Sequence, residues 1–154
     1  MSGTVAYRRA AGNALPAEPP AWVRRWIGLP FKLGGRGPRA FDCWGLARAV
    51  LAEEFDIRLP RYDRGYPETE GDRAALASLV RDGMPGWYAV ERPAAGDLAL
   101  LRHGAHACHI GVVVGRGWML HIEHGTDSAI DRTDGPRWSR RLVGFYMFDG
   151  AAGC

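Results

Sequence analysis

The stretch FDCWGLARAVL, residues 41–51, places a cysteine where a helix should begin. Asp42 is a residue type that caps helix N-termini, so Cys43 becomes the first helical position. Apolar residues recur at helical spacing after it, which predicts a helix that runs to about Phe55. Its core-facing stripe comprises Cys43, Leu46, Ala47, Val50 and Leu51. The sequence therefore predicts a thiol at a helix N-terminus, turned toward the core.

The segments around this helix predict one domain. With 154 residues the chain is long enough for one core and short for two. Residues 1–18 lack any helical or strand period and are expected to form a flexible arm, so that a single domain spans residues 19–150. Short helices are expected over residues 22–27 and 70–82. The glycine-rich residues 34–38 predict a turn that leads into the cysteine helix.

After Trp87 the sequence changes to short runs rich in strand formers. Glycine and proline separate these runs, and their position after the helices favours an α+β domain with a small antiparallel sheet. The expected strands cover residues 87–92, 97–102, 108–114, 118–124, 128–132 and 144–148. We therefore expect the N-terminal helices to pack on this sheet, the cysteine helix among them.

All five histidines lie in the sheet region, between residues 103 and 124. In the two expected strands of that region the even positions are apolar, whereas His109, His121 and Glu123 occupy odd positions. Alternation of this kind predicts that one face of the sheet is buried and that the histidines share the other.

The length of the turn around Gly115 determines whether the apolar positions of the two strands lie on one face and the histidines on the other. Both sets stay on common faces only if the turn has an odd number of residues. A three-residue turn puts His109 and His121 on diagonal sites, with Cα atoms about 7–8 Å apart. Gly111 lies between them on the same face and leaves room for another backbone, so we expect the cysteine helix to dock there.

A thiol, an imidazole and a second polar group are the parts of a cysteine-dependent acyl transfer. The positive end of a helix dipole and a nearby imidazolium both lower the pKa of a thiol, which favours a thiolate at Cys43. His109 would hold the proton and return it to a leaving amine, and His121 would orient the His109 ring. Backbone N–H groups at the helix start are suited to stabilise an oxyanion.

Other interpretations stay open at this point. Glu123 lies opposite His109 in the predicted register and is an alternative orienting group. Ligand types for a zinc site are present in His106, Cys108, His121 and His124. Cys108 and His121 face opposite sides of the sheet, however, and no tight pair spacing supports a closed site, so no metal and no cofactor is expected. The other histidines are expected at strand ends or in loops, in contact with solvent.

Charge and hydropathy limit the classes of partner. The net charge is +3 and the arginines are spread without a dense basic run, so direct nucleic-acid binding is not expected. No stretch approaches the about 20 apolar residues of a membrane span, and the N-terminal residues lack the apolar core of a secretory signal. We therefore expect synthesis in the cytoplasm without a signal peptide. The three cysteines form no C-x-x-C pair, so reduced thiols are expected.

These motifs resemble the NlpC/p60 family of papain-like cysteine peptidases from bacterial cell walls. PFKLGGRGPRAFDCWGL, residues 30–46, is similar to the nucleophile segment of the family, and AAGDLALLR to its Gly-Asp-Leu strand. HIGVVVGRGWMLHIEHG resembles its His-Val-Gly strand and the histidine strand that follows, and RWSRRLVGFYMF the closing strand of its phage-tail branch. The resemblance covers residues 26–148 and implies a papain-like fold.

The resemblance also implies an activity. It makes Cys43 the nucleophile, His109 the base and His121 the third member of the catalytic set. The family cleaves stem peptides of peptidoglycan, typically between γ-D-glutamate and a diamino acid. The implied function is therefore a cell-wall endopeptidase, a thiol protease that needs no cofactor.

Three further positions are implied to border the substrate. The aspartate beside the cysteine is associated in the family with a free amine of the substrate, which gives a use to Asp42, whose charge would otherwise oppose ionisation of the thiol. Phe31 stands where the family usually has Tyr, and Trp44 where Ser is common. The tryptophan at position 44 is similar to the residue at this place in the branch of the family found in phage tails and gene transfer agents.

That branch implies a virion component. The protein would assemble with tail tip or hub proteins, act in the periplasm or cell wall of a recipient cell, and so aid DNA delivery. Two alternatives keep the fold. One is a structural tail-tip component with weak or no activity, which Phe31 and Trp44 favour, and the other is a papain-like amidase or acyltransferase.

Overall fold

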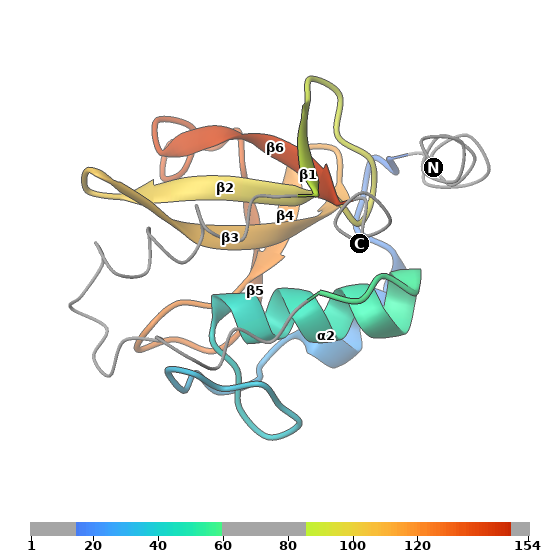
Figure 1. Ribbon diagram of the computed structural model, residues 1–154, viewed down its shortest axis with the longest axis vertical. Coiled ribbons are helices and arrows are strands. Elements are labelled where there is room, and N and C mark those ends of the chain that lie inside the picture. The colour runs from blue at the N-terminus through green and yellow to red at the C-terminus, as the bar shows by residue number, and fades with distance from the viewer. Residues whose placement is uncertain (1–14, 60–85, 149–154) are drawn as a thin grey trace.

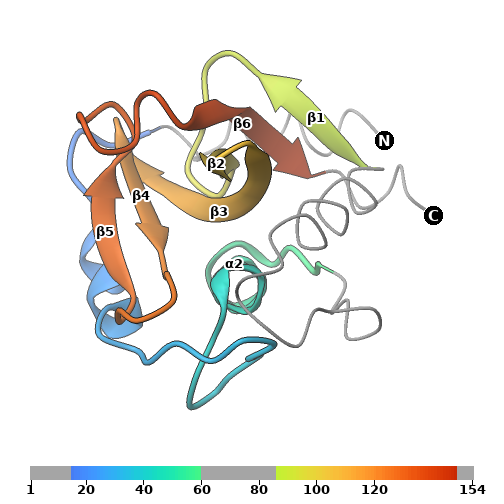
Figure 2. The same cartoon turned by 90° about the vertical axis from the view of Figure 1, so that its left-hand side faces the viewer.

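The computed structural model describes residues 15–59 and 86–148 and has the expected α+β architecture. A six-stranded antiparallel sheet in the order β1-β6-β2-β3-β4-β5 packs on helix α2, Cys43–Phe55. Figures 1 and 2 show α2 beneath the curved sheet, closest to β3. The other elements are the 3₁₀ helix η1 (Ala21–Trp26) and the strands β1 (Trp87–Val90), β2 (Leu98–His103), β3 (His106–Gly115), β4 (Trp118–His121), β5 (Ala129–Arg132) and β6 (Leu142–Phe148).

Helix α2 begins and ends where the sequence predicts. Asp42 is its N-cap, in an extended conformation, and its carboxylate accepts a hydrogen bond from the N–H of Gly45 at 2.7 Å. The helix ends after Phe55, where Asp56 takes a left-handed conformation with φ of 55°. Because the cap satisfies a backbone donor that the helix itself leaves unpaired, Cys43 is fixed as the first helical residue.

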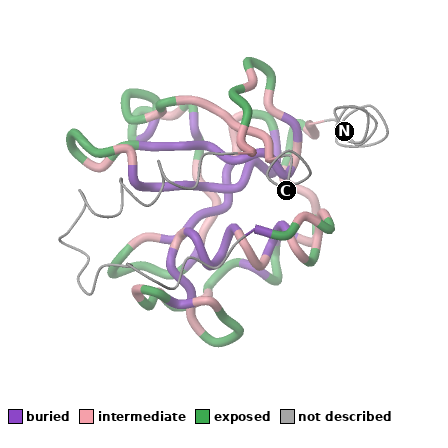
Figure 3. The backbone as a smooth tube through the Cα atoms, in the orientation of Figure 1, coloured by how far each residue is buried: buried purple, intermediate pink, exposed green. Residues whose placement is uncertain are grey.

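The main core lies between α2 and the even-numbered side of β3 and β4. Its buried residues include Leu46, Val50 and Leu51 of the helix and Ile110, Val112, Val114 and Leu120 of the strands. Figure 3 shows the buried segments of α2 and of the central strands facing one another. The helix packs on this side because it is the uniformly apolar side, and burial of apolar surface drives the contact.

The expectation that α2 docks at Gly111 is therefore wrong. Gly111 is on the opposite side of the sheet, and a Cβ added to it would lie 2.7 Å from the sulfur of Met119. The glycine makes room for a neighbouring side chain of its own sheet rather than for the helix backbone.

The hairpin of β3 and β4 has the predicted register, seen in the pairs Val112–Leu120 and Val113–Met119. The turn is built differently from the prediction, since two residues, Arg116 and Gly117, follow a bulge between Val113 and Gly115. A bulge adds one residue to its strand, so the parity equals that of a three-residue turn. His109 and His121 consequently lie on one face, as predicted.

Some expectations for the flanking segments fail or lie outside the described residues. The short helix expected over residues 22–27 is present as a 3₁₀ helix over residues 21–26, a type that suits a six-residue segment between prolines and Gly28. Strand β4 ends at His121 rather than at residue 124. The predicted helix over residues 70–82, residues 1–14 of the arm and Cys154 are not among the described residues. No helix in residues 15–59 and 86–148 is long and apolar enough to cross a membrane.

Candidate active site

The chain that enters α2 folds back onto the side chain of Asp42. One carboxylate oxygen accepts from the guanidinium of Arg36 at 2.8 Å and from Gly45, and the other accepts from the N–H of Gly34 at 3.0 Å. The Arg36 and Asp42 side chains are 3% and 2% exposed. The charge of Asp42 is therefore matched by a buried guanidinium and two backbone donors. A contact of Asp42 with a substrate amine stays a prediction.

Gly45 lets the glycine-rich turn lie directly on the helix. A Cβ at Gly45 would be 1.9 Å from the carbonyl oxygen of Gly35. The same carbonyl accepts a hydrogen bond from the N–H of Asp42 at 3.2 Å. Residues 34–38 thus form a backbone clamp on the first turn of α2, and glycine is required where the two backbones meet.

The segment before the clamp is attached to the loop that follows β4. The ring of Phe31 packs edge-on against that of His124, with centroids 5.5 Å apart. Leu29 donates its N–H to the hydroxyl of Ser128, and Ser128 donates its own N–H to the carbonyl of Leu29, both at 2.9 Å. Because His121 ends β4 just before this loop, these contacts bring the nucleophile segment to the His121 end of the strand.

Cys43 lies at this end of α2. It is half-buried and packs against the main core. The helix contacts β3 and β4, the strands that carry His109 and His121, on their even-numbered side, whereas the two histidines occupy odd positions. Figure 1 shows the first turn of α2 on the side of the molecule where β3 begins. Cys43 thus has the predicted place at a helix N-terminus, and its role as nucleophile stays a prediction.

His109 and His121 meet through their ring nitrogens. Nε2 of His109 lies 2.8 Å from Nδ1 of His121, and both residues are 3% exposed. This hydrogen bond is the contact predicted from the hairpin register. Glu123, the alternative orienting group, instead accepts a hydrogen bond from Arg137 at 2.6 Å. The geometry therefore favours His121 as the residue that orients the His109 ring.

Two residues that the sequence reasoning missed complete this cluster. Nε2 of His121 lies 2.9 Å from Oδ2 of Asp131, which also accepts from the indole N–H of Trp138 at 3.2 Å. Trp138 is 1% exposed and stacks on the His109 ring, with centroids 5.3 Å apart and planes at 19°. The odd position of Asp131 in the strand after β4 was a usable signal. The contact of Asp131 with His121 could not be predicted from it, because the length of the loop before β5 does not fix which residues of β4 and β5 pair.

Burial favours the neutral form of both histidines. It lowers the pKa of His109 well below the usual value, assisted by the nearby side chains of His121, His103, Arg137 and Arg141. It also lowers the pKa of His121, although the hydrogen bond and the charge of Asp131 oppose this change. The resting imidazolium expected from the sequence is therefore disfavoured, and His109 is suited to act as a neutral base.

The remaining predicted residues lie in different environments. Trp44 is buried in the main core with its ring 6.3 Å from that of Trp87, and its contact with substrate stays a prediction. Cys108 is buried, as predicted. His103, expected in solvent, is half-buried with its ring 5.1 Å from that of His109. In the part of the chain that the structure describes, no group of three or more histidine, cysteine or acidic side chains is placed to hold a metal ion.

Several bacterial proteins are similar in sequence to this chain. It is 27% identical over 116 residues to the Murein DD-endopeptidase MepS/Murein LD-carboxypeptidase of Escherichia coli K12, a match that covers 75% of this chain and 54% of that protein. It is 31% identical over 127 residues to the probable endopeptidase p60 of Listeria welshimeri, covering 81% of this chain and 21% of p60. The chain therefore spans only part of the length of these relatives.

A solved structure and a family model agree on the fold. The crystal structure of the NlpC/p60 domain of the peptidoglycan hydrolase SagA matches with a TM-score of 0.55 at 20% identity, over 84% of this chain and 94% of that domain. The model of the NlpC/P60 family matches residues 28–147, which include α2 and the strands that carry the histidines. On this match, the chain belongs to the NlpC/P60 family.

Proposed function

We propose that this domain is a cysteine endopeptidase that cleaves stem peptides of peptidoglycan. The observation that carries the proposal is the buried 2.8 Å hydrogen bond between His109 and His121, on the two strands that α2 contacts. The relatives support the substrate class, since MepS is named a murein endopeptidase and SagA a peptidoglycan hydrolase. The fold alone supports no particular reaction, so the proposal rests on the site.

In the proposed reaction Cys43 is the nucleophile. The ring of His109 takes the proton of the Cys43 thiol while the sulfur attacks the carbonyl carbon of the scissile amide. The C–N bond breaks, and His109 gives the proton to the departing amine. Water then attacks the thioester, with His109 as base again, and releases the carboxylic acid and the thiol. No metal or other cofactor takes part in this scheme.

The finer proposal for the bond is the amide between γ-D-glutamate and the diamino acid. Its support is the resemblance of the nucleophile segment, with Asp42 directly before Cys43. Two purified muropeptides test it: an L-alanyl-γ-D-glutamyl-diamino acid tripeptide, and a dimer joined through a D-alanyl cross-link. Mass spectrometry should show cleavage within the tripeptide. Cleavage of the cross-link alone would assign a different bond.

The activity itself is tested on purified sacculi. The protein should release stem-peptide fragments that mass spectrometry detects, and Cys43→Ala should release none. Cys154→Ala is the matched control because it removes a thiol far along the chain from the proposed site. Activity that survives Cys43→Ala would overturn the mechanism. A trapped acyl-enzyme that passes its acyl group to an added amine would indicate an acyltransferase instead.

The proposed setting is the tail of a phage-like particle, where the domain would open the wall of a recipient cell. Its support is the resemblance of Trp44 and of residues 137–148 to the tail branch of the family. Particles purified from producing cells should contain the chain together with tail tip or hub proteins, as shown by mass spectrometry. Recovery of the chain only from the producer's own cell envelope would contradict this setting.

A further inference from the structure

Within the proposed catalytic set, Asp131 bonds to His121. Its Oδ2 atom lies 2.9 Å from Nε2 of His121, which in turn contacts His109 through the other ring nitrogen. We infer that Asp131 is a positioning residue that fixes the tautomers of both histidines, so that Nδ1 of His109 is the atom that takes the thiol proton. The inference deepens the proposed function and rests on it for the role of His109.

The assignment follows from which groups can donate. An ionised carboxylate only accepts hydrogen bonds, so Nε2 of His121 must carry a hydrogen. In a neutral ring the other nitrogen, Nδ1 of His121, then carries a lone pair and accepts from Nε2–H of His109. The remaining nitrogen of His109, Nδ1, is left with its lone pair. The position of the hydrogen on His109 therefore depends on its position on His121, which Asp131 sets.

The assignment requires that both histidine rings are neutral, and the surroundings of the two rings agree with this. Burial lowers the pKa of His109 and of His121. The charged or titratable groups that act on His109 are His121, His103, Arg137 and Arg141. Those that act on His121 are Asp131, Glu123 and Arg137. Burial is the largest cause at both rings, so an additional proton that would make either ring an imidazolium is not favoured.

Asp131 is held in place although its side chain is 35% exposed. The indole N–H of Trp138 and the guanidinium of Arg137 donate to the same Oδ2 atom at 3.2 and 3.3 Å. Trp138 also stacks on His109, so one buried side chain fixes the aspartate and the plane of the base together. This arrangement differs from that of a surface carboxylate, which has no fixed orientation.

The variant Asp131→Asn tests the inference because it keeps the shape and loses the obligatory acceptor. An asparagine can turn its NH₂ group toward Nε2 of His121, which reverses every step and leaves hydrogen on Nδ1 of His109. Asp131→Glu restores an acceptor and should restore the wild-type tautomers. Asp134→Asn is the control, since Asp134 is an exposed carboxylate that pairs with Arg132.

The primary readout is ¹⁵N NMR of the histidine rings in the full chain at about pH 8, where a neutral imidazole dominates. Wild type, Asp131→Glu and Asp134→Asn should show Nε2–H and bare Nδ1 at His109. Asp131→Asn should show a mixture or the reversed tautomer. On sacculi its kcat should fall about 100-fold or more with little change in KM, since general-base catalysis contributes about 10²–10⁴-fold.

The outcomes separate the inference from the proposed function. Wild-type protein that is inactive on sacculi, with tautomers that follow Asp131, would end the proposed function and support the positioning role. Asp131→Asn with wild-type tautomers would overturn the inference, whatever its activity. If Asp131→Asn does not fold, the spectrum of the wild type decides instead. Hydrogen on Nδ1 and a bare Nε2 at His109 in the wild type would overturn the inference, because the Asp131 carboxylate can only accept.

Discussion

Two aspartates support the proposed site, one beside the thiol and one behind the histidines, and they are held in opposite ways. Asp42 is 2% exposed, and its partners Gly34, Arg36 and Gly45 lie close to it in sequence. Asp131 is 35% exposed and contacts His121 from a neighbouring strand. Asp42 fixes the path of the backbone, whereas Asp131 fixes the protons of two rings. Loss of the first should therefore reduce stability most, and loss of the second should change proton positions.

The largest effect on stability is expected from Asp42→Ala. The substitution removes the helix cap and leaves the Arg36 guanidinium, which is 3% exposed, without its counter-charge. Breaking one side of a buried ion pair costs about 3–5 kcal/mol. Urea unfolding at neutral pH measures the loss.

The double variant Arg36→Met with Asp42→Asn serves as its control. It removes both charges while keeping an oxygen that can cap the helix, and it should recover much of the stability. A loss below about 1 kcal/mol in Asp42→Ala would mean that the buried pair does not hold this segment.

Gly45→Ala gives a test in which two effects have opposite signs. Inside an exposed helix, replacing glycine by alanine stabilises by about 1 kcal/mol. Here the added Cβ would lie 1.9 Å from the carbonyl oxygen of Gly35, so the clamp must move away from α2. Forcing extra atoms into a packed site costs about 1–3 kcal/mol, and the net change should be destabilising. A gain in the urea midpoint would show that the clamp is not required.

The Asp42 side of the site was largely predictable from the sequence, and the Asp131 side was not. The cap and the bounds of α2 follow from local signals at Asp42 and Phe55, which need no knowledge of the rest of the fold. The contact of His109 with His121 followed from strand parity across one short turn.

The predictions failed for contacts that depend on the packing of segments distant in sequence. Asp131 and Trp138 reach the histidines only through the pairing of β5 with β4, and the loop between these strands does not reveal that register. The docking side of α2 was predicted wrongly from Gly111, because a glycine in a strand can make room for a side chain as well as for a backbone. Arg36 as the partner of Asp42 depends on how the glycine-rich turn folds back, which residue spacing does not specify.

The histidine side should make stability depend on pH. The pKa values of His109 and His121 are lowered in the fold, so between those values and about 6.5 the unfolded chain binds more protons. Stability should therefore be full above about pH 6.5 and fall as the pH decreases, by at most about 1.4 kcal/mol per pH unit for each histidine. Urea unfolding from about pH 7.5 to about pH 5 measures the slope.

The variant His109→Gln isolates one ring in this experiment. Glutamine does not titrate in the range, so the variant should lose stability less steeply on acidification than the wild type. An equal or steeper slope in the variant would show that His109 is not held neutral by the fold. Asp42→Asn should change the slope little, because Asp42 is not among the main causes of the pKa shift of either histidine.

The smallest change in stability is expected from Arg137→Ala. Arg137 is 55% exposed and bonds to Glu123 and Asp131, and pairs of this kind contribute about 0–1 kcal/mol. Its charge nevertheless lowers the pKa of both site histidines, so its removal should raise the pKa of His109 and of His121 in an NMR titration.

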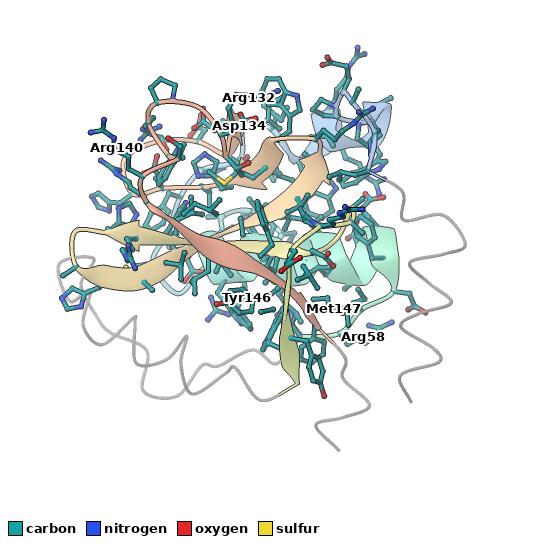
Figure 4. The ribbon with its side chains drawn as sticks, turned by 90° about the horizontal axis from the view of Figure 1, so that it is seen from above. Arg58, Arg132, Asp134, Arg140, Tyr146 and Met147 are labelled. Carbon is teal, nitrogen blue, oxygen red and sulfur yellow. The ribbon has the colours of Figure 1, made fainter. Side chains whose placement is uncertain are left out.

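Arg132→Ala is the matched control for Arg137→Ala, since it breaks an exposed pair with Asp134, seen at the rim in Figure 4, and its charge is not among those that act on the histidines. Unchanged histidine pKa values in Arg137→Ala, or a loss of stability as large as in Asp42→Ala, would contradict the contrast between the two aspartates. The expected result gives the two arginines separate tasks. Arg36 neutralises a buried charge and so holds the backbone, whereas Arg137 adjusts the proton affinity of the histidines from the surface without holding the fold.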